Sequence, residues 1–285
     1  MKKLLLCLFF PYIINAQTAF ISGNDTICDN GFPAVVKIDF NGIPPYTFIY
    51  DINGVTQVKD STYTNPYILN TKIGGTYTLV SYNDAISFGA VTLGSNVTID
   101  TNATNGTGDI TLGAVTGGNN TLTLTTENNI AGADITASGA IAGVTTLTLA
   151  NVGGTATLSA DVDVTTLSVN NTVANVVFTG NGSSVVNAVA FANDGTLTLG
   201  QDGGTQTYNG GLTTTSVGGA VTLNGTIATS NDAIVFGAVT LGSNTIVDTN
   251  ATNGTGDITI AAVTGGNNTL TLTTENNIAG ADITA

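Results

Sequence analysis

An internal duplication constrains the fold of this 285-residue chain more than any other feature. Residues 84–137 recur as residues 232–285, 148 positions downstream, and the two copies differ at only six positions. These are Ser87/Val235, Val97/Thr245, Thr98/Ile246, Ile99/Val247, Leu112/Ile260 and Gly113/Ala261. Self-similarity of this kind is the mark of a repeat array, in which each unit contacts mainly its neighbours. The chain is therefore expected to form an extended scaffold.

From residue 84 onward, threonine alternates with aliphatic residues. The clearest runs are residues 121–125, 146–149, 166–169, 196–199 and 221–223. Side chains of a strand point alternately to its two faces, so each run predicts a strand with Leu, Val or Ile inside and Thr outside. Asn-Gly, Gly-Gly and Asp-Gly pairs separate the runs and favour turns, because Gly and Asn tolerate positive φ. We expect no helix in this region.

The spacing of equivalent leucines indicates how the strands assemble. Leucines at the same place in successive runs are Leu122, Leu147 and Leu167. Steps of this size, roughly 20 to 25 residues, are what one coil of a parallel β-helix takes. Residues 84–285 therefore predict a right-handed parallel β-solenoid of about nine coils, with about six or seven coils in the super-repeat. An antiparallel bundle of sandwich modules is the alternative at this spacing.

One substituted triplet bears on strand register. Val97-Thr98-Ile99 in the first copy is replaced by Thr245-Ile246-Val247 in the second. Because side chains alternate with a period of two, the exchange either moves the threonine to the other face or shifts the register by one residue.

Residues 1–83 differ in composition from the rest of the chain. Residues 1–16 combine two lysines, a short apolar run and a terminal Ala16, which predicts a secretory signal peptide. In residues 17–83, short strands are predicted at residues 34–40, 46–50, 55–59 and 75–82, with Asn53-Gly54 as a tight hairpin turn. This spacing predicts an antiparallel sandwich of immunoglobulin-like type. Once the signal peptide is removed, Cys28 is the only thiol, which excludes an intrachain disulfide and a cysteine-based metal site.

Both regions resemble known families. The motifs TICDNG (26–31), PPYTFIY (44–50), NPYIL (65–69) and GTYTLVSYND (75–84) resemble Ig-like or PKD-like modules in surface and secreted proteins of Bacteroidetes. Those modules continue into a second Cys and a last strand, whereas this chain changes into the repeat. The LTL and AVTL strands, the GG, NG and DG turns and the QTYNGG phrase at 206–211 are similar to filamentous-haemagglutinin-type adhesins and autotransporter passengers. The resemblance implies a surface-displayed or secreted scaffold and assigns no functional residue.

The distribution of charge excludes several classes of partner. The formal net charge is −14, there is no histidine, and the five cations are Lys2, Lys3, Lys37, Lys59 and Lys72. Nucleic-acid binding depends on cationic neutralisation of phosphates, so a chain without cations after residue 72 is not expected to bind nucleic acid. Anionic lipid surfaces are disfavoured for the same reason. Nucleophilic catalysis by a Ser–His or Cys–His pair is impossible without histidine.

Two groups of polar residues could form an ionic site, and for both the alternative is that they only stabilise turns or face solvent. Asp161 and Asp163 would fall on one strand face, where paired carboxylates could serve a polysaccharide-cleaving enzyme. Aromatic platforms and cations beside the carboxylates are absent, so the acids are expected to keep the rod soluble. Residues 105–109 and 201–204 place oxygen ligands among glycines and are the candidate calcium segments, although the tandem GGxGxDxUx nonapeptides of calcium-binding solenoids are missing. We assign no catalytic, cofactor-binding or metal-ligating residue.

These observations favour an exported, adhesin-like structural protein rather than an enzyme. It would stand outside the cell or on its outer surface and bind glycans or proteins of a host or neighbouring cell through multivalency. A carbohydrate-active β-helix enzyme and a calcium-dependent matrix or surface-layer protein are the alternatives. No hydrophobic stretch after residue 16 is long enough for a membrane helix. The second copy breaks off at Ala285, where the first continues with Ser138, so the chain is expected to be a fragment of a longer repetitive protein.

Overall fold

The computed structural model describes residues 18–22, 33–41, 46–83, 86–101, 108–126, 129–252, 255–274 and 279–285. These residues form strands, turns and loops without a helix, so none of them belongs to a helix that could cross a membrane. The chain is all-β, as the sequence predicts. The expected signal peptide at residues 1–16 and Cys28 lie outside the described residues.

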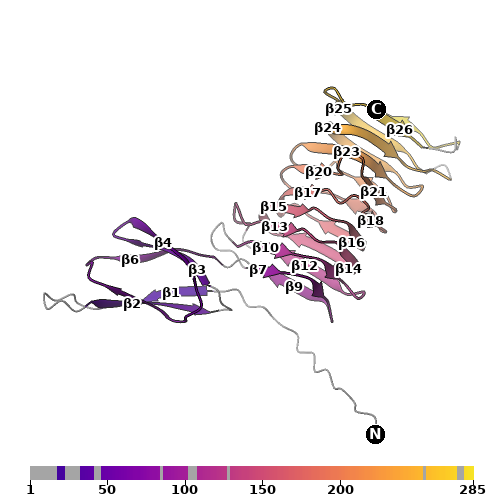
Figure 1. The fold of residues 1–285 in the computed structure, drawn as a ribbon. Helices are drawn as coiled ribbons and strands as arrows, with labels where there is room; N and C mark the ends of the chain where they lie inside the picture. The colour runs from indigo at the N-terminus through magenta and orange to yellow at the C-terminus, as the bar shows by residue number, and fades with distance from the viewer. Residues whose placement is uncertain are drawn as a thin grey trace, which may run out of the picture.

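Six strands form the N-terminal region (Figure 1). They are β1 (Thr18–Ser22), β2 (Ala34–Asn41), β3 (Tyr46–Ile52), β4 (Val55–Thr62), β5 (Tyr67–Thr71) and β6 (Tyr77–Asn83). They pair antiparallel in two three-stranded sheets, in the orders β1-β2-β5 and β4-β3-β6. Both sheets contribute to one core, in which Ile38, Phe40 and Phe48 are buried. The aromatic rings supply much of its contact area, with the rings of Phe40 and Tyr46 stacked at 4.5 Å.

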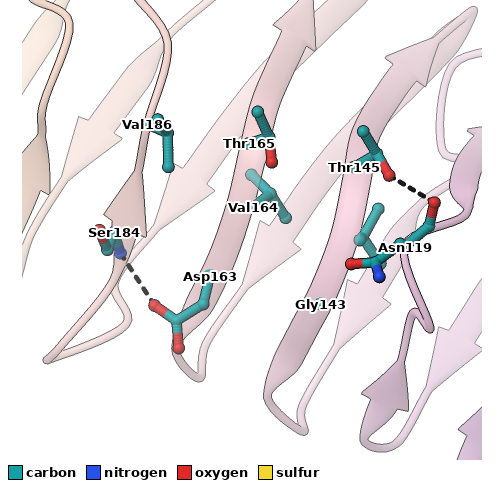
Figure 2. A pocket seen from close by; sticks show the side chains of 9 residues that line it. Asn119, Gly143, Thr145, Asp163, Val164, Thr165, Ser184 and Val186 are labelled. Carbon is teal, nitrogen blue, oxygen red and sulfur yellow. Dashed lines mark hydrogen bonds between the residues drawn. The ribbon is translucent and has the colours of Figure 1, made fainter.

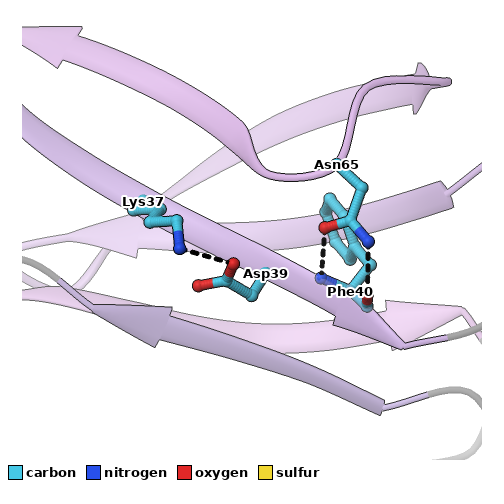
Figure 3. A network of polar contacts seen from close by, with 4 residues as sticks. All are labelled: Lys37, Asp39, Phe40 and Asn65. Atoms are coloured by element: carbon cyan, nitrogen blue, oxygen red, sulfur yellow. Dashed lines mark hydrogen bonds and ion pairs between the residues drawn. The ribbon is translucent and has the colours of Figure 1, made fainter.

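Local sequence signals explain the turns and the exposed face of this region. Asn53 and Gly54 have positive φ values of 55° and 79°, as the tight turn between β3 and β4 requires. Lys37 and Asp39 project outward from β2 and form an ion pair at 2.7 Å (Figure 3). Beyond the end of the β2–β5 pairing, the Asn65 side chain accepts a hydrogen bond from the Phe40 N–H and donates one to the Phe40 carbonyl. The amide thus binds the backbone of β2 two residues beyond Ile38, where the ladder ends.

The remaining 21 strands form one parallel sheet that winds into a solenoid (Figure 1). They are β7 (Ile86–Phe88), β8 (Val91–Thr92), β9 (Val97–Asp100), β10 (Ile110–Leu112), β11 (Val115–Thr116), β12 (Thr121–Thr125), β13 (Ile135–Ala137), β14 (Ile141–Ala150), β15 (Val152–Leu158), β16 (Val162–Val169), β17 (Val173–Phe178), β18 (Ser184–Val185), β19 (Val189–Ala190), β20 (Leu197–Leu199), β21 (Thr205–Tyr208), β22 (Leu212–Thr213), β23 (Val221–Ala228), β24 (Ile234–Asp248), β25 (Ile258–Thr264), β26 (Leu270–Thr273) and β27 (Ile283–Thr284). The antiparallel alternative is therefore wrong for residues 86–285.

The pairings divide the solenoid into three faces. The first face runs through β7, β10, β13, β15, β17, β20, the start of β23, the middle of β24 and the end of β25. The second runs from β8 through β11, β14, β16, β18, β21, β23 and β24 to β26. The third runs from β9 through β12, β14, β16, β19, β22, β24 and β25 to β27.

Each face thus stacks nine layers through eight steps, which is about eight turns. The sequence predicted about nine coils, one more than the turns counted here. Hydrogen bonds between neighbouring layers join residues 21 positions apart in the middle of the solenoid and 25 positions apart in both copies. At ~4.8 Å per step, the described layers rise about 38 Å.

The alternating pattern places aliphatic side chains inside and threonines outside, as predicted. On the first face one inward position is filled, layer after layer, by Phe88, Leu112, Ala137, Leu158, Phe178, Leu199, Leu223 and Leu241. The neighbouring outward position carries Ser87, Thr111, Thr136, Thr157, Val177, Thr198, Thr222, Thr240 and Thr264. Burial of the inner stack supplies the main stabilising free energy, and the β-branched outer stack suits a wetted strand surface.

The super-repeat does not span a whole number of turns. Ile86 lies on the first face of the first layer, where it pairs with Ile110. Its counterpart Ile234 lies on the third face of the seventh layer, paired with Leu212 and Ile258. The duplication therefore makes six turns plus two further faces, so the second copy is rotated by one face relative to the first.

The register stays the same at the substituted triplet. Val97 pairs with Leu122, and Thr245 pairs with its counterpart Leu270. Thr245 therefore points inward and is 1% exposed, while Ile246 points outward and is 42% exposed. The Thr245 hydroxyl is satisfied there because its single proton can be donated to the carbonyl oxygen of Leu223 or of Ser243, which lie at 3.2 and 3.1 Å.

Candidate functional site

The solenoid has an open groove of about 370 Å³ at the corner between its second and third faces (Figure 2). It crosses the second to fifth layers, so no single turn contains it. Residues from β14, β16 and β18 line it together with Asn119, from the turn between β11 and β12, and Val186, which follows β18. The lining residues are Asn119, Gly143, Val144, Thr145, Asp163, Val164, Thr165, Ser184 and Val186.

A β-bulge in β14 shapes this corner. Ala142 pairs with Asp163 and Val144 pairs with Val164, which leaves Gly143 as an extra residue between them. Gly143 has a φ of 68°, a conformation that glycine adopts without the steric cost of a side chain. The extra residue bends the strand where it passes from the second face to the third. The Thr145 hydroxyl closes the bend by donating to the Asn119 carbonyl oxygen at 2.6 Å.

Asp163 is the only charged residue in the groove lining. Its Oδ1 accepts a hydrogen bond from the Ser184 N–H at 3.1 Å, which fixes the carboxylate against the next layer (Figure 2). Within the described part of the chain, its Oδ2 and the Thr165 hydroxyl have no hydrogen-bond partner. The groove therefore offers a charged acceptor and a hydroxyl that can donate or accept.

Apolar groups complete the lining. Val144 and Val164 are buried in the wall, with exposures of 1% and 4%, whereas Val186 is 52% exposed. No aromatic residue lines the groove. Its surface thus combines methyl groups with a few fixed polar atoms, as small-molecule sites commonly do, but it is more open than an enclosed pocket.

The structure separates the two aspartates that the sequence paired. Both project from the same side of the chain around β16, as predicted, but only Asp163 lines the groove. Asp161 instead holds the Gly182 N–H through its Oδ1 at 2.7 Å. A glycosidase mechanism needs two carboxylates on either side of a bond, and the lining supplies one. The absence of enzyme activity stays a prediction.

Several other acids near layer corners also bind the backbone of the next layer. Asp109 accepts the Asp134 N–H at 2.9 Å, and the second copy repeats this contact between Asp257 and Asp282. Asp134 in turn accepts the Thr155 N–H. Asparagines do the same at Asn96, Asn175, Asn231 and Asn244. A fixed acceptor at each of these corners satisfies an N–H group that the strand ladders leave unpaired.

The candidate calcium segments gain no ligand cluster. Residues 102–107 lie outside the described residues, and Asp109 is engaged with Asp134. At residues 201–204 the Gly204 N–H donates to the Gln201 carbonyl, which makes the segment a turn. No group of three or more His, Cys, Asp or Glu side chains comes together among the residues that the structure describes.

Sequence reasoning missed a buried polar cluster in the fifth and sixth layers. Gln206 is 1% exposed, and its side-chain amide donates to the Phe178 carbonyl at 2.9 Å. The Tyr208 hydroxyl donates to Gln206 Oε1 at 3.0 Å, and its ring lies edge-on to Phe178 and Phe191. Burial raises the pKa of Tyr208 well above its usual range. The QTYNGG phrase at residues 206–211 was the available signal.

Sequence also missed the groove, because its lining is assembled from four layers. Gly143 inside an otherwise alternating segment was the one local indication of a bulge. Comparison with protein-family models, with curated proteins and with solved structures finds no match to this chain. A function for this chain is therefore inferred from the geometry and chemistry of the solenoid alone.

Proposed function

We propose that this protein is an exported, adhesin-like structural protein whose solenoid displays many weak binding surfaces outside the cell. The observation that carries the proposal is the stack of nine layers with a largely apolar interior and a hydroxyl-rich exterior. Stacked layers separate binding surfaces along an axis, which suits a scaffold better than a single catalytic centre. The corner carboxylates support this role because they hold the layers together.

The N-terminal region is proposed to be an immunoglobulin-like module. Its six strands follow the sheet orders β1-β2-β5 and β4-β3-β6, which match the A-B-E and C′-C-F arrangements of that fold.

The pattern at residues 1–16 supports export, and the net charge of −14 fits an extracellular surface that repels anionic polymers. We also propose that the solenoid is right-handed, as parallel crossover connections are in nearly all proteins.

The partners are proposed to be glycans or proteins on the surface of a host or neighbouring cell. Beads coated with residues 17–285 should adhere to cell layers, and the free monomer should compete only at concentrations about a hundredfold higher, because linked weak sites gain avidity. Beads that fail to adhere, or a monomer that competes at equal site concentration, would contradict the proposal. N-terminal sequencing of the protein exported from a Gram-negative host should begin at Gln17.

A carbohydrate-active enzyme remains the second candidate because Asp163 presents an unpartnered carboxylate oxygen in a groove, as far as the described residues extend. Incubation with neutral and acidic polysaccharides should release no reducing ends on the scaffold proposal. Release that disappears in Asp163→Asn but persists in Asp161→Asn would instead establish catalysis at the groove.

The alternative of a calcium-dependent matrix protein has a separate test. If it is wrong, the melting temperature should not change when millimolar calcium is added.

A further inference from the structure

We propose that the groove between the second and third faces binds a neutral saccharide chain lying along the solenoid axis. The inference rests on the proposed function and specifies the ligand class of one of its surfaces. The groove crosses four layers, which at ~4.8 Å per step is about 14 Å between the first and the last. A short oligosaccharide segment fits this length, whereas a monosaccharide would occupy only part of it.

The polar groups of the groove suit sugar hydroxyls. Asp163 Oδ2 can accept hydrogen bonds from ligand hydroxyls, and the carboxylate is held in place because Oδ1 is bound to the Ser184 N–H at 3.1 Å. Thr165 and the exposed side chain of Asn119 lie along the same corner and can both donate and accept. A charged acceptor makes the strongest of these contacts, so Asp163 is expected to dominate the affinity.

Charge selects against acidic ligands. The lining has one carboxylate and no cation, and the chain has no Lys, Arg or His after Lys72. Uronic acids, sulfated sugars and phosphates would bring like charge toward Asp163 without any compensating partner. A neutral chain avoids this repulsion and can still use the carboxylate as an acceptor.

The apolar part of the lining suits the carbon-bound hydrogens of a sugar ring. Val186 is 52% exposed and stands beside Thr165 in the next layer, so its methyl groups are available to a ligand. Without an aromatic platform the contact area per ring is small, which implies weak binding by a single groove. Weak single-site binding is what a multivalent scaffold uses.

The test is calorimetric titration of residues 17–285 with cellohexaose, laminarihexaose and mannohexaose, and with hexagalacturonic acid as the acidic probe. At least one neutral hexasaccharide should bind, and the acidic one should not. Asp163→Asn should weaken binding about tenfold, because it replaces the free acceptor oxygen with a donor while keeping an oxygen for Ser184. Thr165→Val should weaken it about threefold.

Asp161→Asn is the matched control, since it removes the same charge from a nearby side chain outside the groove. Binding by this variant should equal that of the wild type, and circular dichroism should show that all three variants keep the same melting temperature. The inference is overturned if no neutral probe binds at millimolar concentration, or if Asp161→Asn and Asp163→Asn weaken binding equally. Adhesion of coated beads without oligosaccharide binding would contradict the saccharide site but not the scaffold role. Oligosaccharide binding without bead adhesion would contradict the scaffold role but not the saccharide site.

Discussion

The two copies of the duplicated segment have nearly the same sequence but differ in burial. In the first copy Ile135 is fully buried, whereas its counterpart Ile283 is 45% exposed. Leu122 is 1% exposed, and its counterpart Leu270 is only partly buried. The last strands of the first copy, β12 and β13, are covered by β14 and β15 of the next layer. Their counterparts in the second copy, β26 and β27, have a neighbouring layer on one side only among the described residues. Burial in this solenoid is therefore conferred by adjacent layers and not by the sequence of the layer itself.

The same comparison explains the strand lengths. The first copy begins with three short strands, β7, β8 and β9, whereas the equivalent residues of the second copy form the single strand β24. The second copy's residues are paired on both sides, with β22 and β23 before them and with β25 and β26 after them. Pairing on both sides holds the backbone extended through the corners, as the cooperative character of stacked repeats implies.

The rotation between copies sets how equivalent surfaces are displayed. The second copy begins one face away from the first after six turns and two faces, which at ~4.8 Å per turn is about 32 Å along the axis. Identical loops therefore project in different directions from the solenoid. For the scaffold function that we propose, this arrangement would present equivalent surfaces on more than one side of the solenoid.

The largest expected effect comes from truncating equivalent isoleucines. Ile135→Ala should lower the free energy of unfolding by about 3 kcal/mol, because it leaves a cavity in the closed interior. Ile283→Ala should lower it by less than about 0.5 kcal/mol, because the side chain is already half in water. Urea unfolding followed by far-ultraviolet circular dichroism measures both.

Outward threonines provide the control for this pair. Thr136 and Thr284 are equivalent, and Thr136 is paired on both sides, whereas the described pairing of Thr284 is with Thr259 alone. Alanine at either position should change stability by about 0.5 kcal/mol or less, as surface substitutions usually do. Equal losses for Ile135→Ala and Ile283→Ala would mean that the second copy is as well covered as the first, and the comparison would fail.

A smaller effect is expected at the corner carboxylates. Asp109→Ala should cost about 1 kcal/mol, because the part-buried Asp134 N–H loses its acceptor. Asp257→Ala should cost a few tenths, because water can reach the exposed Asp282 N–H. Asn at either position keeps an acceptor oxygen and should retain most of the stability. A larger loss from Asp257→Ala than from Asp109→Ala would show that the contact does more than satisfy a donor.

The sequence was sufficient to predict the fold of the repeats, because each layer repeats a local rule. Thr-Leu alternation gives the face of every residue, and the spacing of Leu122, Leu147 and Leu167 gives the length of a turn. The duplication could not reveal the rotation between copies, since the length of chain in a turn varies from layer to layer. Nor could it reveal the burial of Gln206, whose side chain reaches the carbonyl oxygens of Phe178 and Gly180 in the preceding layer.

The candidate site was only partly predictable for the same reason. Asp163 was singled out as an outward acid, and it lies in the groove. Its sequence neighbour Asp161 was expected to act with it, but the two carboxylates bind the backbone at Gly182 and Ser184. The groove depends on where the Gly143 bulge lies relative to the adjacent layers, and a position across layers is not written in any one segment.

The smallest difference between equivalent positions of the two copies is expected at the substituted triplet. Thr245→Val should lower stability by about 0.5 kcal/mol, because the loss of the hydroxyl's hydrogen bond to the carbonyl oxygens of Leu223 and Ser243 is partly offset by a second buried methyl group. Val97→Thr, at a half-buried position in the first layer, should change stability by less than that, since its hydroxyl can reach water. Urea midpoints of the two single variants and the double variant measure these differences. If Thr245→Val stabilised the protein, the hydrogen bonding of the inward threonine would not be what stabilises it at this position. The register that both copies share would then come from the flanking leucine and valine pairs alone.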